Sequence, residues 1–537
     1  MNDFELPESE EIADVCLVLE GTYPYVQGGV SSWVHQIVTQ LSELKFALFF
    51  LGSVKEQAVK RKYIPPPNVI SITEVFLFEP LPKAQLQETG WKGEPRTEFY
   101  LRLKNFYQAK SETERMDGWW ALVEHLDRDD VNPTFGNLMR DEEAWQLLSD
   151  LNDEFAAEES FIDFFWAVRF LHLPVWIALL GRTKVPPAKV YHSVSTGYAG
   201  MLGAIASRKR KKPYFITEHG IYTKERIAEI SQATWIHDPP SRYFDVTRGL
   251  SPLKRLWIGL FVFLGVLTYS AAQLIVSLFE GNTGLQIEFG AEARRLQVVP
   301  NGIDPTIFDL ALEKRRKRLE TRSEPVVIGF IGRVVPIKDV KTLIRAARSV
   351  VARNPNVRFD LIGPTEEDPE YFSECQQMVE LMGLKQHVLF LGPQNVREIL
   401  ADLDLCVMTS ISEGLPLVIL EGFSAGVPCV ATDVGACREL IFGRTPEDKA
   451  LGRAGLLTKI CSPLDTADAL LRVISDRKNL VATGEAGRVR VERYYQQDDI
   501  MGIYRKYYSD TSWASPDAPP GPYAALDDPK QWRKDSV

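Results

Sequence analysis

Residues 326–346 read VVIGFIGRVVPIKDVKTLIRA and set the pattern of the C-terminal half of the chain. The Val- and Ile-rich run at 326–331 predicts a buried strand, and the apolar spacing over 340–351 predicts an amphipathic helix. Alternation of strand and helix predicts a parallel sheet covered on both faces, which is a doubly wound α/β domain. Four further strand-like runs continue the pattern: VRFDLIG (357–363), HVLFLG (387–392), DLCVMTS (404–410) and PCVAT (428–432).

The N-terminal half begins in the same way, with a strand-like run at 14–21, a loop and a helix expected over 30–44. Later strand-like runs are FALFFLG (46–52), KVYHSV (189–194), PYFITEHG (213–220) and QLIVSLFEG (273–281). We therefore predict two Rossmann-like domains that face each other across a cleft, with ligands near the carboxyl ends of the strands. The expected segments are an N-terminal domain (1–298) with a helical insertion (about 74–170), a C-terminal Rossmann-like domain (299–484), a helix crossing back to the first domain (485–508) and a tail (509–537).

Composition agrees with a folded protein of two large domains. The chain has 537 residues, of which 45% are hydrophobic and 25% charged. Its formal net charge of −10 argues against general nucleic-acid binding, which needs a basic surface. The six cysteines form no C-x-x-C pair, which indicates neither a disulfide framework nor a zinc site. The acidic N-terminus is unlike a secretory signal, so a cytoplasmic protein is expected.

One apolar run, LWIGLFVFLGVLTY at 256–269, is shorter than the roughly 20 residues that a membrane span needs. A buried helix is the simpler interpretation. Its basic flank, Lys254 and Arg255, leaves open a surface that docks on a membrane or on a partner protein.

The stretch SISEGLPLVILEGFSAGVPCVAT at 410–432 carries the strongest functional signal. Glu413 follows a predicted strand, Pro416 suits the first turn of the next helix, and Glu421 lies inside that helix about two turns further on. Paired carboxylates accept hydrogen bonds from the hydroxyls of a polyol. Amides at a helix N-terminus suit an anion, so the backbone of four residues is expected at the ligand: Gly414, Leu415, Pro416 and Leu417.

Two cations lie in the turn that follows the first strand of this half. Arg333 and Lys338 come directly after Gly332 and before a helix. A guanidinium and an ammonium at this position could neutralise a leaving diphosphate without a metal ion. No D-x-D pair follows a strand where it would hold a nucleotide-bound metal.

Two weaker signals lie in the N-terminal half. Gly28 and Gly29 stand between a strand and a helix, where glycine lets a ligand approach the backbone closely. His219, within Glu218-His219-Gly220, directly follows the strand-like PYFIT, where active-site residues are often found.

Taken together, these residues resemble glycosyltransferase family 4, which has the GT-B fold. The resemblance rests on the Gly28-Gly29 loop, the His219 region, PNGID (300–304), GRVVPIKD (332–339) and the two glutamates. It implies a retaining, metal-independent transferase that needs no cofactor. A closer resemblance to one subgroup of this family, over residues 20–38 and 217–226, implies a UDP-sugar as donor.

The resemblance also implies a role for each matching residue. Arg333 and Lys338 would bind the donor diphosphate, Glu421 the ribose hydroxyls, and Glu413 and His219 the transferred sugar. Donor contacts are further expected from Asn301, Gly332, Asn395 and Val396, the last two lying against the base within GPQNV (392–396).

The sequence leaves two other functions open. A UDP-sugar epimerase could share this fold and would need no acceptor. A non-catalytic scaffold of a membrane synthase could bind UDP without turnover and would use the run at 256–269 for docking. The closer resemblance further implies a growing glycan as the acceptor and a role in building a bacterial exopolysaccharide.

Overall fold

The computed structural model describes residues 11–55, 60–88, 91–236, 249–321 and 325–515. The chain divides into two compact units. Unit 1 contains residues up to Val276, then Leu285–Gln297, and the chain from Tyr507 on; unit 2 contains Ser277–Gly284 and Val298–Lys506. Both units are Rossmann-like, as predicted from the alternating apolar runs.

Unit 1 is built on a seven-stranded sheet of order β3-β2-β1-β4-β5-β6-β7. Pairing is parallel between β1 and β2, β2 and β3, β1 and β4, and β4 and β5. Its strands are β1 (Ala13–Glu20), β2 (Phe46–Gly52), β3 (Val69–Phe76), β4 (Ala188–Ser193), β5 (Tyr214–Glu218), β6 (Leu274–Ser277) and β7 (Leu296–Val298). The helices beside this sheet are α1 (Gly29–Gln40), α8 (Tyr198–Arg210), α9 (Tyr222–Gln232), α10 (Pro252–Ala271) and α11 (Gly281–Glu288).

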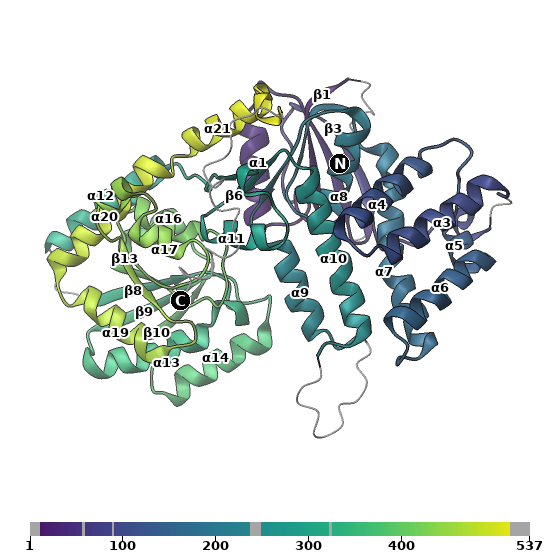
Figure 1. Ribbon diagram of the computed structural model, residues 1–537. Helices are drawn as coiled ribbons and strands as arrows, with labels where there is room; N and C mark the ends of the chain where they lie inside the picture. The colour runs from purple at the N-terminus through teal and green to yellow at the C-terminus, as the bar shows by residue number, and fades with distance from the viewer. Residues whose placement is uncertain (1–10, 56–59, 89–90, 237–248, 322–324, 516–537) are drawn as a thin grey trace. The chain divides into compact units, whose positions relative to one another are not determined.

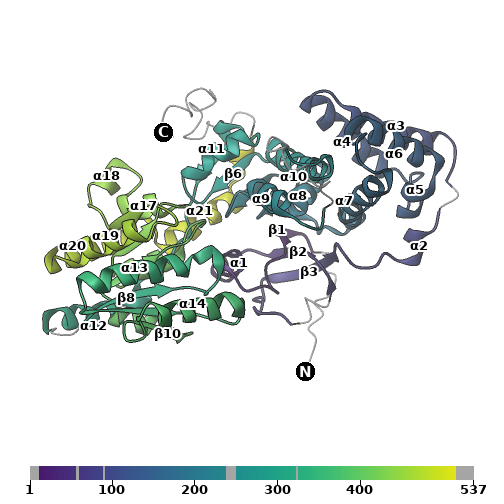
Figure 2. The same cartoon turned by 90° about the horizontal axis from the view of Figure 1, so that it is seen from below.

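The helical insertion expected at 74–170 is present but lies later in the chain, over residues 83–181. It starts later because the chain to Phe76 pairs with β2 as strand β3. It ends later because α7 continues unbroken through Pro174. Its helices, grouped together in Figure 2, are α2 (Lys83–Leu86), α3 (Glu94–Gln108), α4 (Glu112–Leu126), α5 (Phe135–Arg140), α6 (Glu142–Phe155) and α7 (Phe161–Gly181).

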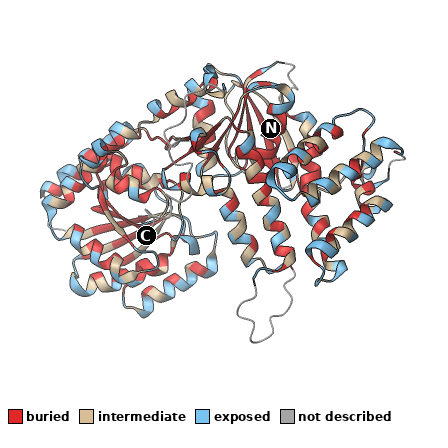
Figure 3. Ribbon diagram, viewed as in Figure 1, coloured by how far each residue is buried: buried red, intermediate tan, exposed pale blue. Residues whose placement is uncertain are grey.

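Unit 2 has a six-stranded sheet of order β10-β9-β8-β11-β12-β13, and its pairings are parallel. Helices cover both faces of this sheet, and the strands between them are largely buried (Figures 1 and 3). The strands are β8 (Val326–Ile331), β9 (Val357–Ile362), β10 (Val388–Gly392), β11 (Leu405–Met408), β12 (Cys429–Thr432) and β13 (Gly455–Thr458). The helices are α12 (Asp309–Thr321), α13 (Val340–Arg353), α14 (Pro369–Leu381), α15 (Val396–Ile399), α16 (Leu417–Ser424), α17 (Cys437–Phe442), α18 (Pro446–Lys449), α19 (Pro463–Ile474), α20 (Arg477–Tyr494) and α21 (Gln497–Ser509).

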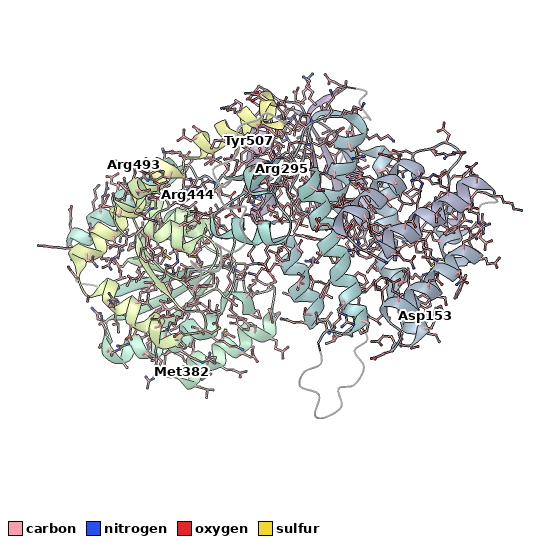
Figure 4. All side chains as sticks on the ribbon, viewed as in Figure 1. Asp153, Arg295, Met382, Arg444, Arg493 and Tyr507 are labelled. Atoms are coloured by element: carbon pink, nitrogen blue, oxygen red, sulfur yellow. The ribbon has the colours of Figure 1, made fainter. Side chains whose placement is uncertain are left out.

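The helix expected over 485–508 is divided between α20 and α21. The break falls at Tyr495 and Gln496, where the backbone pairs with Ile303 instead of continuing the helix. The end of α21 belongs to unit 1, where the Tyr508 hydroxyl lies 2.8 Å from Nδ1 of His192 on β4. Tyr507, labelled in Figure 4, contacts the ring of Phe215 edge-on. The predicted tail lies outside the described residues from position 516 on.

The apolar run at 256–269 forms most of α10, which packs against α8 and α9. Lys254 in its flank is buried and donates to the carbonyl of Ser231 at 3.1 Å, so it does not present its charge to a membrane surface. By length and composition alone, α10 and Phe161–Lys184 could each cross a membrane, but 56% of each apolar window is buried in the structure. This burial favours the buried-helix interpretation.

Candidate functional site

The order of the unit 2 sheet reverses between β8 and β11, and the strongest sequence signals follow these two strands. In open α/β sheets, ligands bind beyond the carboxyl ends of the strands at such a reversal. The Thr409 hydroxyl, just past β11, lies 3.0 Å from the carbonyl oxygen of Lys338 and 3.1 Å from that of Asp339. The amide of Ile411 donates to the carbonyl of Ile337 at 2.8 Å. The two loops are therefore held together by the backbone as well as by side chains.

Lys338 and Glu413 form an ion pair across these loops. The ammonium of Lys338 lies 2.5 Å from Oε1 of Glu413, and the two side chains are 22% and 13% exposed. An ammonium has three N–H donors, so this contact leaves others for an anion. The structure thus brings together the cation and the first carboxylate of the sequence prediction.

Two glycines that the sequence prediction missed shape the loops around this pair. Gly435, after β12, has φ +53°, and a Cβ there would lie 2.2 Å from the carbonyl oxygen of Gly414 and 2.4 Å from that of Glu413. Gly363, after β9, has φ +146°, and its Cβ would lie 2.1 Å from the carbonyl oxygen of Gly332. Only glycine fits both the backbone conformation and the space. The sequence signal that could have pointed to these two residues was a glycine at or soon after the end of a predicted strand.

Helix α16 begins one residue later than predicted, and Pro416 is its N-cap rather than its first helical residue. Pro416 has no amide hydrogen and no side-chain acceptor, so the cap leaves the amides of the first turn without a side-chain partner. Gly414 and Leu417 are partly exposed, whereas Leu415 and Pro416 are buried. The resulting amide array suits an anion.

Glu421 lies on α16, as predicted, and is partly buried. Among the described residues, nothing forms a hydrogen bond with its carboxylate. Burial raises its pKa, and the positive charge of Arg397 opposes this effect. A partly buried carboxylate without a partner suits a ligand that brings hydroxyl donors.

Arg333 is oriented by a residue that the sequence prediction did not include. Its Nη1 lies 2.6 and 2.7 Å from the two carboxylate oxygens of Glu367, which follows β9. Both side chains are about half exposed, at 52% and 51%. Because a pair this exposed is weak, an incoming anion can compete for the guanidinium.

The remaining predicted residues of unit 2 lie at loops and strand ends. Asn395 caps α15 by accepting from the amide of Arg397, and Val396 is the first residue of that helix. Asn301 is buried, and its Oδ1 has no hydrogen-bond partner among the described residues. Gly332 follows β8 directly, and its amide donates to Ile362 at 2.9 Å.

In unit 1, His219 follows β5, as predicted. Its ring contacts that of Trp33 edge-on, with the centroids 4.7 Å apart. The Nε2 atom is buried without a hydrogen-bond partner in the described parts of the chain. Burial lowers the pKa of His219 to about 3, so the ring is neutral at physiological pH.

Glu218, next to this histidine, is buried, and Glu20 is partly buried. Glu218 was singled out from the sequence only as part of the Glu218-His219-Gly220 triplet, and Glu20 was not singled out. Glu218 accepts from the Tyr269 hydroxyl, from Gln286 at 3.0 Å and from the amide of Tyr222 at 3.2 Å. Glu20, at the end of β1, accepts from the Tyr222 hydroxyl at 2.7 Å. Burial raises the pKa of both carboxyls. Through Tyr222, these two groups fix the ends of β1 and β5 relative to each other.

Gly28 and Gly29 lie at the start of α1 and are exposed. A Cβ at either position would meet no other atom within 4 Å. Gly28 has an extended backbone, with φ 171°, that any residue can adopt. Nothing within unit 1 therefore requires glycine at these two positions.

The low pKa of His219 predicts a pH effect on stability. In the unfolded chain, His219 binds a proton once the pH falls below 6.5, whereas in the folded protein it stays neutral down to about pH 3. The contribution of His219 to the unfolding free energy therefore falls as the pH falls from 6.5 to about 3. Relative to His219→Gln, the natural protein should lose about 1–2 kcal/mol of unfolding free energy between pH 7 and pH 5. Urea unfolding at the two pH values measures this difference. Equal losses in both proteins would contradict the assignment.

Comparison with known proteins places the chain in a family. Residues 13–294, more than half of the chain, match the family model described as "Domain of unknown function (DUF3492)". The chain belongs to this family. The DUF3492 region covers most of unit 1, including the helical insertion. Residues 325–476 match the model described as "Glycosyl transferases group 1", which covers both loops of the Lys338–Glu413 pair.

Curated relatives and solved structures resemble this DUF3492 protein over different lengths. It is 30% identical to a D-inositol 3-phosphate glycosyltransferase of Geodermatophilus obscurus, over 47% of this chain and 56% of the relative. It is 27% identical to one of Corynebacterium jeikeium, over 45% and 57%. The chain thus spans little more than half the length of these relatives.

Two solved structures share the fold. HepE of Anabaena, crystallised in complex with UDP, aligns with a TM-score of 0.56 at 16% identity, over 92% of this chain and 99% of that one. Sucrose-phosphate synthase of Thermosynechococcus elongatus aligns with a TM-score of 0.55 at 14% identity, over 93% and 100%. The resemblance extends over both units and supports the predicted GT-B class of fold.

Proposed function

We propose that this protein is a retaining glycosyltransferase that takes its sugar from a UDP-sugar, without a metal ion, and adds it to a growing glycan. The observation that carries the proposal is the Lys338–Glu413 pair at the sheet reversal, beside the uncapped N-terminus of α16. The match to a glycosyl transferases group 1 model over this region supports it. The crystal complexes of HepE with UDP and with UDP-glucose support the choice of nucleotide.

In this proposal, the diphosphate leaves as the acceptor hydroxyl attacks the anomeric carbon from the same face. Lys338, Arg333 and the amides of Gly414, Leu415 and Leu417 stabilise the negative charge of the leaving diphosphate. Such stabilisation acts because the donors are already in place when charge develops. Glu413 holds Lys338 in position and contacts the sugar, while neutral His219 can donate or accept a hydrogen bond without adding charge.

The wider role that we propose is the building of a bacterial exopolysaccharide in the cytoplasm. EGTYPYVQGGVSSWVHQIV (20–38) and TEHGIYTKER (217–226) resemble PelF, the glycosyltransferase of Pel exopolysaccharide synthesis. The DUF3492 match covers both stretches. Docking to an inner-membrane synthase complex belongs to the same proposal.

The direct test is nucleotide release from UDP-, GDP- and ADP-sugars, with a glycan acceptor, in the presence and absence of EDTA. We expect release from UDP-sugars alone, unchanged by EDTA. Conversion of the donor to an isomeric UDP-sugar would indicate an epimerase instead. Binding of UDP without turnover of any donor would indicate a scaffold, and an absolute metal requirement would contradict the proposed chemistry.

Replacing Glu421 with glutamine should weaken UDP binding. The amide carries no charge and offers one acceptor oxygen in place of two, so it forms weaker hydrogen bonds with adjacent ribose hydroxyls. We expect a roughly tenfold rise in Kd, about 1.4 kcal/mol, by calorimetry. Glu374→Gln, on α14 and paired with Lys341, is the matched control and should bind as the natural protein does. An unchanged Kd for Glu421→Gln would remove Glu421 from the nucleotide site.

A further inference from the structure

The helical insertion encloses an apolar cavity that the proposed transfer reaction does not use. Its volume is about 120 Å³, and it lies among α3, α4, α5, α6, α7 and α10. Large apolar side chains form most of its wall, among them Phe99, Leu103, Phe106, Trp119, Leu147 and Leu264. Cavities of this size and lining stay dry and accept small apolar molecules.

Several polar groups in the wall are already paired with other side chains or with the backbone, whereas Nε1 of Trp119 is buried without a hydrogen-bond partner among the described residues. Tyr100 donates to Asp141 at 2.9 Å. Tyr107 forms a hydrogen bond with Nε2 of His172, whose Nδ1 lies 2.6 Å from the carbonyl oxygen of Val168. The cavity therefore offers an occupant mainly contact with hydrocarbon and aromatic surface.

A smaller pocket adjoins this cavity and leads toward exposed side chains. Its volume is about 20 Å³, and it adds Trp145, Phe165 and Arg169 to the lining. Five residues line both spaces: Leu138, Met139, Ala144, Leu148 and Val168. Trp145 is 44% exposed and stacks on Phe165, with ring centroids 5.5 Å apart.

Further aromatic and aliphatic side chains of α7 are exposed around Trp145. They are Phe161 (36% exposed), Ile162 (66%), Trp166 (45%) and Phe170 (54%). Arg169 lies among them, with its guanidinium over the rings of Phe135 and Trp166. Among the described residues, no carboxylate pairs with Arg169. Exposed apolar side chains gathered around an unpaired cation suit a ligand that is apolar with an anionic end.

We propose that the helical insertion binds the anion of a short-chain carboxylic acid such as hexanoate, with its alkyl chain in the cavity and its charged head at Arg169. Five residues line both pockets, so a short chain in the cavity lies close to the outer pocket. Arg169 lines the outer pocket, where the head of a chain inserted in this way would lie. The inference concerns unit 1 alone and does not depend on the proposed transfer reaction.

Calorimetry of the full chain with hexanoate tests the proposal. We expect saturable binding of one hexanoate per chain. Leu148→Trp places a larger side chain at a position that lines both pockets and should weaken binding at least tenfold. Leu381→Trp, at a leucine of unit 2 that is 86% exposed, is the matched control and should bind hexanoate normally.

A second variant tests the role of the charged head group without changing the size of a core side chain. Arg169→Gln should weaken hexanoate binding about fivefold but leave the binding of uncharged hexanol unchanged. Failure of the natural protein to bind hexanoate would overturn the proposal. Equal binding by the natural protein and a folded Leu148→Trp would also overturn it, as would equal effects of Arg169→Gln on hexanoate and hexanol.

Discussion

Replacing Lys338 with alanine is expected to lower turnover at least a hundredfold while the protein stays folded. Loss of one preorganised donor to a developing negative charge typically costs about 3–4 kcal/mol of barrier. The Lys338 side chain is 22% exposed, and its removal breaks one ion pair at a loop, so stability should change little. Turnover is measured as the initial rate of UDP release at saturating donor, and stability is measured by thermal unfolding of the same samples.

The matched control is Lys341→Ala. Lys341 lies three residues further along, on α13, and its ammonium pairs with Glu374. Removing this exposed pair should leave turnover within about twofold, because surface ion pairs contribute little. If Lys338→Ala turned over as fast as the control, Lys338 would not stabilise the leaving diphosphate.

Replacing Gly435 with alanine should disable the site from a position outside the predicted ligand contacts. The new Cβ would meet the carbonyl oxygens of Glu413 and Gly414, and the residue would keep an unfavourable left-handed backbone. Strain and overpacking together should cost about 2–4 kcal/mol of unfolding free energy. Relief of the overlap would displace the Glu413 loop, so turnover should fall at least tenfold.

Gly383→Ala is the control that distinguishes the cost of backbone strain from the cost of overpacking. Gly383 has φ +69°, but no atom lies within 4 Å of a Cβ at that position. Backbone strain alone should then cost about 1 kcal/mol and leave turnover unchanged. If Gly435→Ala lost no more stability than Gly383→Ala and kept its turnover, the Glu413 loop would not depend on close packing against Gly435.

Local patterns predicted most of the architecture. The apolar runs that became β8, β9, β11 and β12 are largely buried strands, and the run that became β10 is a partly buried edge strand, in the order expected of a doubly wound sheet. Parallel strands are recognisable because both of their faces are buried and their sequences are nearly continuously apolar. The predicted boundaries of helices were less accurate where pairing with a distant part of the chain overrides the local preference for helix. Residues 495–496 leave the helix to pair with Ile303, which lies almost 200 positions earlier in the chain.

The candidate site was predicted in part. Lys338 and Glu413 could be chosen because each follows a strand, and neighbouring strand ends lie close together. Their direct ion pair, and that of Arg333 with Glu367, depend on side-chain conformations that spacing does not specify. The paired roles of Glu20 and Glu218 were missed because Tyr222, which joins them, lies about 200 residues from Glu20.

The central claim is that fixed cations and helix amides, rather than a bound metal ion, hold the donor diphosphate. A crystal structure of the protein soaked with UDP tests it most directly. We expect diphosphate oxygens within hydrogen-bond distance of Lys338 Nζ and of the amides at the start of α16, with the ribose hydroxyls at Glu421. A diphosphate bound away from Arg333, Lys338 and residues 413–421, or held through a metal ion, would contradict the account.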